Sequence, residues 1–95
     1  MASNRPSLFL LEHQQAAEAD LARMHRAFTL AVVRLVNSGA PLRIEAAVFV
    51  PDQARSLYLV EAAIAGQVVK ATDVAGLANT TVRPVLRLHD MPPSH

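Results

Sequence analysis

Two nearly identical hexapeptides constrain the fold of this 95-residue chain more than any other feature. They occupy residues 7–12 (SLFLLE) and residues 56–61 (SLYLVE). Each is an apolar run of strand length, and each is followed by an alanine-rich segment with helical periodicity. We therefore expect one strand–helix–strand unit that is written twice.

Hydrophobic periodicity and stop signals set the expected boundaries of the elements. Apolar residues over 16–37 recur at the spacing of one helical face, and Gly39 with Pro41 marks the end of that helix. Gly76 marks the end of a second helix in the same way. The expected elements are helices over 16–37 and 63–75, strands over 7–13, 42–50, 55–61 and 81–88, and a turn over 51–54.

The order of these elements is typical of the ferredoxin-like βαββαβ fold, an α+β fold with a four-stranded antiparallel sheet and two helices on one face. Right-handed crossovers place the two repeated strands side by side in the centre, and we expect these two to be parallel. Pro84 cannot donate to a ladder, which predicts an edge strand. We expect a single domain over 7–89, a flexible lead-in over 1–6 and a loose tail over 90–95.

Composition argues against several classes of partner. Nine Lys and Arg residues balance eight Asp and Glu residues, so neither a nucleic-acid phosphate backbone nor a membrane surface is an expected partner. No apolar run is long enough to span a membrane, and the first residues lack the apolar segment of a secretory signal. Cysteine is absent, which leaves no disulfide or thiolate site, and we expect a cytoplasmic protein.

Alternation along the strands predicts which side chains lie beneath the helices. This set is expected to comprise Leu8, Leu10, Leu42, Ile44, Val48, Leu57, Leu59, Pro84, Leu86 and Leu88. The opposite, open face is then expected to present Phe9, Leu11, His13, Arg43, Glu45, Ala47, Phe49, Tyr58, Val60, Arg83, Val85 and Arg87. An exposed apolar patch with a polar rim marks an interface or a pocket. We expect a homodimer that packs sheet to sheet, as in dimeric α/β barrels, with a small-ligand pocket between or beside the sheets.

The open face supplies the candidate site residues. Phe9, Phe49 and Tyr58 would form an apolar floor. The expected polar contacts to a ligand are His13, Arg43, Glu45 and Arg87. His13 or Tyr58 is also a candidate acid/base group. The alternatives are a hydrogen-bonded surface histidine, a tyrosine that packs in an interface, and ion pairs between the arginines and Glu45.

Glu12 and Glu61 end the two repeated strands. If those strands are parallel, both carboxylates lie at one edge of the sheet, where they could hold a metal ion or divide acid/base roles. Alternatively, each carboxylate faces the N-terminus of the following helix and has a structural role. His25 falls at the boundary of the first helix's apolar stripe, where we expect a structural role. No two histidines have the i, i+4 spacing of a metal site.

Several short motifs occur in an informative order: Leu10-Leu11-Glu12, Val48-Phe49-Val50, Leu59-Val60-Glu61-Ala62, Ala75-Gly76-Leu77 and Val82-Arg83-Pro84-Val85-Leu86. They resemble a group of small bacterial proteins of unknown function, some of which are described as nickel-binding or nickel-responsive. The resemblance covers most of residues 7–88 and implies a ferredoxin-like homodimer. It also implies a divalent metal such as nickel, with Glu12 and His13 at the matching positions. The chain departs from the pattern at His13, where arginine is usual, and at Ala63, where proline is usual.

These observations predict a homodimeric, non-catalytic protein that binds a small molecule or a metal ion at the open face of the sheet. One alternative is a cofactor-independent isomerase or cyclase of this architecture, with His13 or Tyr58 as its acid/base group. Fold alone does not decide between these functions. The other alternative is a purely structural dimer.

Overall fold

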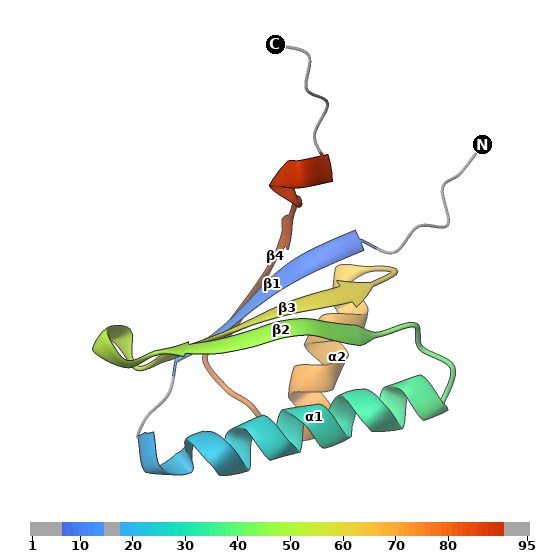
Figure 1. Ribbon diagram of the computed structural model, residues 1–95. Helices are drawn as coiled ribbons and strands as arrows, with labels where there is room; N and C mark the ends of the chain where they lie inside the picture. The colour runs from blue at the N-terminus through green and yellow to red at the C-terminus, as the bar shows by residue number, and fades with distance from the viewer. Residues whose placement is uncertain (1–6, 15–17, 91–95) are drawn as a thin grey trace, which may run out of the picture.

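Four strands form one sheet, and two helices cover one of its faces (Figure 1). The computed structural model describes residues 7–14 and 18–90. The predicted lead-in 1–6, the predicted start of the first helix at Ala16 and the tail 91–95 lie outside these residues. The elements are β1 (Ser7–Gln14), α1 (Leu21–Asn37), β2 (Arg43–Val50), β3 (Arg55–Ala62), α2 (Ala65–Ala75) and β4 (Thr80–Val85), with 3-10 turns at Glu18–Asp20, Pro51–Gln53 and Leu88–Asp90.

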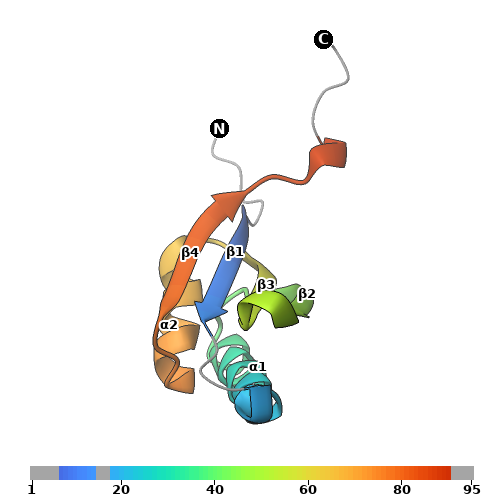
Figure 2. The ribbon, with the colours of Figure 1, turned by 90° about the vertical axis from the view of Figure 1, so that its left-hand side faces the viewer.

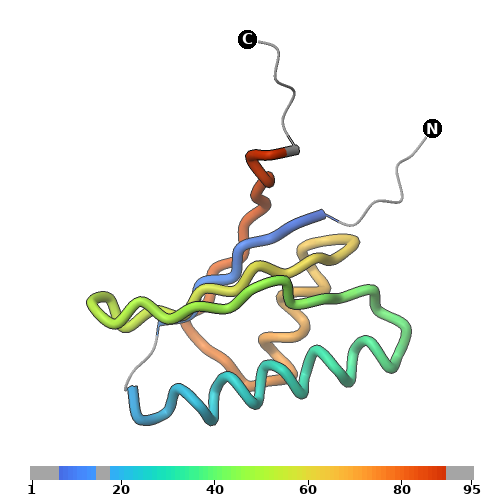
Figure 3. Tube along the Cα trace, viewed as in Figure 1, coloured from blue at the N-terminus to red at the C-terminus, as the bar shows by residue number. Residues whose placement is uncertain are grey.

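The sheet has the strand order β2-β3-β1-β4, and every neighbouring pair is antiparallel. This confirms the βαββαβ prediction, with the repeated hexapeptides in the two central strands and Pro84 in an edge strand. Figure 3 shows how the two helical crossovers run beneath the sheet.

The prediction that the repeated strands are parallel is wrong. The β2–β3 hairpin reverses the chain between the two crossovers, so β3 runs opposite to β1. Glu12 therefore pairs in register with Leu57, and Glu61 pairs with Leu8. The two carboxylates lie at opposite ends of the sheet and cannot form a shared site.

The stripe predicted for α1 forms the helical side of the core. Met24, Phe28, Ala31, Val32 and Leu35 are buried, and Leu21 packs against them while half-buried. Phe28 is fully buried, and its ring centroid lies 4.7 Å from that of Tyr58. The contact joins the middle of α1 to a central strand.

Two glycines of α2 differ in what their backbone requires. Gly76 caps the helix with a φ of 75°, and the next residue donates its N–H to the Thr72 carbonyl at 3.0 Å. Gly66 lies in the first turn of α2, where a Cβ would find Ile64 Cδ1 at an ordinary 3.7 Å.

We expect Gly76→Ala to lower the free energy of unfolding by about 1 kcal/mol, because alanine is strained in the left-handed region. Gly66→Ala should raise it by about 0.5 kcal/mol, because alanine loses less conformational entropy in a helix. Urea denaturation of both variants and of the wild type measures the two changes in the free energy of unfolding. Effects of the same sign would contradict this account.

The face assignment of the central strands is the reverse of the prediction. Phe9, Leu11, Tyr58 and Val60 are buried beneath the helices, together with His13, Ser56 and Ala62. Leu8, Leu10, Leu57 and Leu59 instead lie on the open face and are half-buried. Both faces of these strands are apolar, so alternation alone gives no direction. The aromatic rings of Phe9 and Tyr58 fill the deeper space between sheet and helices.

A break in register divides β2 into two halves. Ile44 pairs with Val60, but Ala46 pairs with the next residue along, Leu59. The extra residue, Glu45, reverses the alternation that follows. Leu42 and Ile44 therefore face the helices as predicted, whereas Val48 is 57% exposed on the open face. The half-buried side chain of Phe49 lies on the helix side, opposite to the prediction.

The chain leaves the sheet earlier than predicted at its C-terminal end. Pro84 pairs with Phe9 on the helix side, and β4 ends at Val85 rather than at Leu88. Leu86 and Leu88 are 78% and 82% exposed, so their predicted place in the core is wrong. Residues 86–90 rise from β4 on the side of the sheet away from the helices (Figures 1 and 2). We call these residues the C-terminal arm.

Candidate functional site

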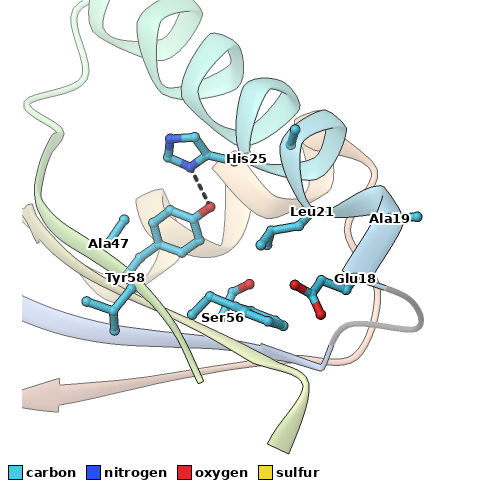
Figure 4. Close-up of a pocket in the computed structure, with 10 residues that line it drawn as sticks. Glu18, Ala19, Leu21, His25, Ala47, Ser56 and Tyr58 are labelled. Atoms are coloured by element: carbon cyan, nitrogen blue, oxygen red, sulfur yellow. Dashed lines mark hydrogen bonds between the residues drawn. The ribbon is translucent and has the colours of Figure 1, made fainter. Parts of the chain in front are cut away.

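A pocket of about 490 Å³ lies between the beginning of α1 and the ends of β2 and β3 where they meet in a hairpin (Figure 4). Its volume is that of a typical small-molecule site. The lining residues are Glu18, Ala19, Leu21, Ala22, His25, Ala47, Val48, Phe49, Ser56 and Tyr58. We call this space the α1 pocket.

Small side chains on both walls leave the α1 pocket open. Ala19 and Ala22 line it from the turn before α1 and from the helix itself. Ala47 lines it from β2, where it pairs in register with Tyr58. Larger residues at these positions would fill the space, so the pocket depends on two neighbouring alanines of the α1 region and on a third that lies 25 residues further along the chain.

Tyr58 forms the inner end of the pocket. Its hydroxyl lies 2.8 Å from His25 Nδ1 and donates weakly to Met24 Sδ at 3.7 Å. The His25 and Tyr58 rings are stacked, with centroids 5.7 Å apart and planes 10° apart. Burial raises the pKa of Tyr58 to about 12, so the phenol keeps its proton at neutral pH. Tyr58 therefore offers a hydrogen-bonding group and not a base.

Ser56 supplies a polar atom that has no hydrogen-bond partner. The residue is 2% exposed, and its Oγ finds no partner among the residues that the structure describes. An unpaired buried hydroxyl costs about 1–3 kcal/mol, so native proteins nearly always satisfy such a group. Figure 4 shows Ser56 on the sheet side of the pocket, between Tyr58 and Glu18. A bound molecule at this position would complete its hydrogen bonding.

The prediction that His13 lies on the open face is wrong, because the residue lies beneath the helices with the other buried residues of β1. It is 8% exposed and pairs in register with Ser56, and its Nδ1 also has no partner in the described part of the chain. It lines a different pocket of about 440 Å³ together with Asp20 and Arg23, which form an ion pair.

Glu12 and His13, the two residues at which the resemblance implies a metal ion, do not point to a common site in this chain. Neighbouring residues of a strand point to opposite faces, so Glu12 lies on the open face and His13 on the helix side. Within residues 7–14 and 18–90, no group of three His, Cys, Asp or Glu side chains is placed to hold a metal ion.

Ion pairs bound the open face at both ends. At one end Glu12 contacts Arg55 Nη1 at 3.1 Å and Arg83 Nη2 at 3.3 Å. At the other end Arg87 Nη2 lies 3.1 Å from Glu45 Oε1 and from Glu61 Oε2. The Arg43 guanidinium also pairs with both of these carboxylates. The predicted polar residues Arg43, Glu45 and Arg87 are thus brought together, but in an ion-pair network.

Because of this network, the free energy of unfolding is expected to depend on pH in the acid range. The hydrogen bond from Arg43 holds the pKa of Glu45 at about 2, below its ordinary value of 4.5. The ionised carboxylate therefore stabilises the fold above pH 4.5, and this contribution is lost as the pH falls toward 2. We expect the free energy of unfolding to fall less between pH 6 and pH 3 in Glu45→Gln than in the wild type.

Urea denaturation at the two pH values measures that difference. Asp73→Asn is the matched control, because Asp73 lies on α2 and makes no ion pair with the described residues. It should keep the wild-type fall. An equal fall in Glu45→Gln and the wild type would contradict the assigned role of the network.

Of the predicted ligand-binding residues, Phe49 and Tyr58 line the α1 pocket, and Phe9 is part of the core. Sequence reasoning missed Ser56 and Glu18, and it gave His25 only a structural role. The spacing of Ser56 and Tyr58, two apart on one strand, places both on one face. This spacing would have placed Ser56 beside Tyr58 in a predicted site, had it been known that this face of the strand lies beneath the helices.

Comparison with protein-family models, with curated proteins and with solved structures finds no match to this chain. Among the described residues, neither helix combines the length and the apolar character needed to cross a membrane.

Proposed function

We propose that this protein is a non-catalytic, homodimeric small-molecule-binding protein whose ligand occupies the α1 pocket. One observation carries the proposal: Ser56, whose buried Oγ has no hydrogen-bond partner among the described residues, lines a mostly apolar space of about 490 Å³. Small-molecule sites combine an apolar wall with a few polar groups that fix the orientation of the ligand. The α1 pocket has this composition, and a ligand would supply the hydrogen-bond partner that Ser56 Oγ lacks among the described residues.

The chemistry of the lining supports binding over catalysis. The predicted isomerase or cyclase would use His13 or Tyr58 as its acid/base group. Tyr58 keeps its proton at neutral pH, and its hydroxyl is already engaged with His25. His13 belongs to the lining of a different pocket. A metal ion receives less support as the ligand, because Glu12 and His13 diverge.

A second copy of the chain is the occupant that we propose for the open face. Leu10 and Leu59 pair in register between the two ion-pair groups, flanked by Leu8 and Leu57. A shallow apolar hollow of about 200 Å³ is lined by Leu10, Ala46, Ala47, Val48, Leu57 and Leu59. The C-terminal arm rises on this same side with its leucines exposed. A second sheet placed here would bury both the central leucines and the arm, and isologous pairing is the commonest way to cover such a face.

Filling the α1 pocket tests the binding proposal. Ala47→Trp adds a bulky ring to the wall opposite α1, and we expect it to abolish binding of aromatic fragments in a ligand-observed NMR screen. Ala63→Trp is the matched control, because Ala63 is exposed in the connection between β3 and α2 and lies outside the lining. It should bind as the wild type does.

Fragments that bind the wild type and Ala47→Trp equally would place the site elsewhere. A wild type that binds none of the fragments would contradict the proposal. Circular dichroism of both variants separates loss of binding from loss of the fold.

A further inference from the structure

The charges around the α1 pocket indicate the class of ligand. Resting on the function proposed above, we infer that the pocket takes a primary amine with an apolar, ring-sized body. In this arrangement the ammonium group lies near Glu18, and the apolar body lies against Leu21 and Phe49, beside the hydroxyl of Ser56.

Glu18 is the carboxylate of the pocket. It lies in the turn before α1 and lines the opening, and Figure 4 shows it across the pocket from Ser56. Among the residues that the structure describes, Glu18 makes no ion pair. Its neighbour Asp20, by contrast, is paired with Arg23. The negative charge at the opening is therefore available to a ligand.

No arginine or lysine is present in the described lining to attract an anion. The nitrogen His25 Nδ1 is engaged with the Tyr58 hydroxyl, which leaves it no role with a ligand anion. The remaining polar side-chain groups are three: His25 Nε2, which accepts when Nδ1 donates to Tyr58, the Glu18 carboxylate, which accepts, and the Ser56 hydroxyl, which can accept or donate. An ammonium group has three donors and no acceptor, so it complements this set better than a carboxylate or phosphate does.

The walls fit a hydrocarbon body. Leu21 and Ala22 from α1 face Ala47 and Phe49 from β2 across the space. A phenyl ring placed here contacts aliphatic carbon on one side and the Phe49 ring on the other, where aromatic pairs are stabilised beyond simple burial. An amine without such a body would leave these walls in water.

Three matched probes test the inference: phenethylamine, 2-phenylethanol and phenylacetate, which share a ring and differ in charge. Each is titrated into the full-length, ¹⁵N-labelled protein at neutral pH, and the shifts of pocket amides give Kd. We expect phenethylamine to bind about fivefold more tightly than the alcohol, as one partly exposed ion pair allows. Phenylacetate should bind more weakly than either.

Two substitutions assign the charge effect. Glu18→Gln should bring the amine to the affinity of the alcohol, and Ser56→Ala should weaken both. Asp52→Asn, which removes an exposed carboxylate in the hairpin turn outside the pocket, should keep the fivefold preference. Raising the salt concentration should reduce the preference of the wild type, because the ion pair is screened.

The outcomes separate this inference from the function on which it rests. Binding of the alcohol or of phenylacetate at least as tight as that of the amine would overturn the amine inference and leave the pocket as a binding site. Retention of the preference in Glu18→Gln would also overturn it. Failure of all three probes to shift any pocket amide would overturn both.

Discussion

Replacing Phe28 by alanine is expected to remove a large part of the stability of this domain. Phe28 is fully buried at the centre of α1 and packs on Tyr58. Truncation of a buried phenylalanine costs about 3–5 kcal/mol, because apolar burial is lost and a cavity remains. Domains of this size have only about 5–15 kcal/mol in total. Urea denaturation followed by circular dichroism measures the loss.

Leu30→Ala is the control for this substitution. Leu30 lies on the same helix, two residues away, and is 49% exposed. Its truncation is expected to change the free energy of unfolding by about 0.5 kcal/mol or less. A Phe28→Ala variant that unfolds at nearly the wild-type urea concentration would contradict the assignment of Phe28 to the core.

Replacing Leu59 by arginine is expected to convert the proposed dimer into single chains. Leu59 lies at the middle of the open face, paired with Leu10 on β1 and with Ala46 on β2. A charge at the centre of a buried interface has no partner there, and such a group costs about 3–5 kcal/mol. The dissociation constant should rise more than 100-fold. Light scattering should then give the mass of one chain, 10.3 kDa, in place of twice that mass.

The control is Leu30→Arg, which places the same charge on the exposed surface of α1, away from the sheet. It should leave the dimer intact. A wild type that scatters as a single 10.3 kDa chain would contradict the proposed interface directly. A Leu59→Arg variant that stays dimeric would move the interface to another surface.

The element order was accessible from the sequence, because its signals are local. The helical stripe at Met24, Phe28 and Leu35 and the left-handed Gly76 are each set by residues close together in the chain. The relative direction of β1 and β3 is not local. It depends on the β2–β3 hairpin, which reverses the chain between the two crossovers. Parallel central strands would put Glu12 and Glu61 at one edge of the sheet, whereas the antiparallel strands put them at opposite ends.

Which side of the central strands is buried against the helices could not be predicted from alternation. Leu10 and Leu11 are both apolar, and either could fill a core. The choice is made by volume, since the larger aromatic residues fit the space beneath the helices. The extra residue in β2 then moves Phe49 to the same side as Tyr58, and a sequence pattern of period two gives no warning of it.

The α1 pocket is a space and not a motif, which is why the sequence did not reveal it. It exists because Ala22 on a helix and Ala47 on a strand face the same volume. Nothing local to either alanine indicates the other. The unpaired Ser56 hydroxyl likewise becomes significant only once its burial is known.

Native mass spectrometry of the protein purified from its own host tests the central claim most directly. We expect a species heavier than twice 10.3 kDa by the mass of two small organic molecules, one for the pocket of each chain, and we expect Ala47→Trp to appear without that excess. A wild-type species at the bare chain mass, or a dimer with no retained molecule, would contradict the claim that the space beside Ser56 holds a ligand.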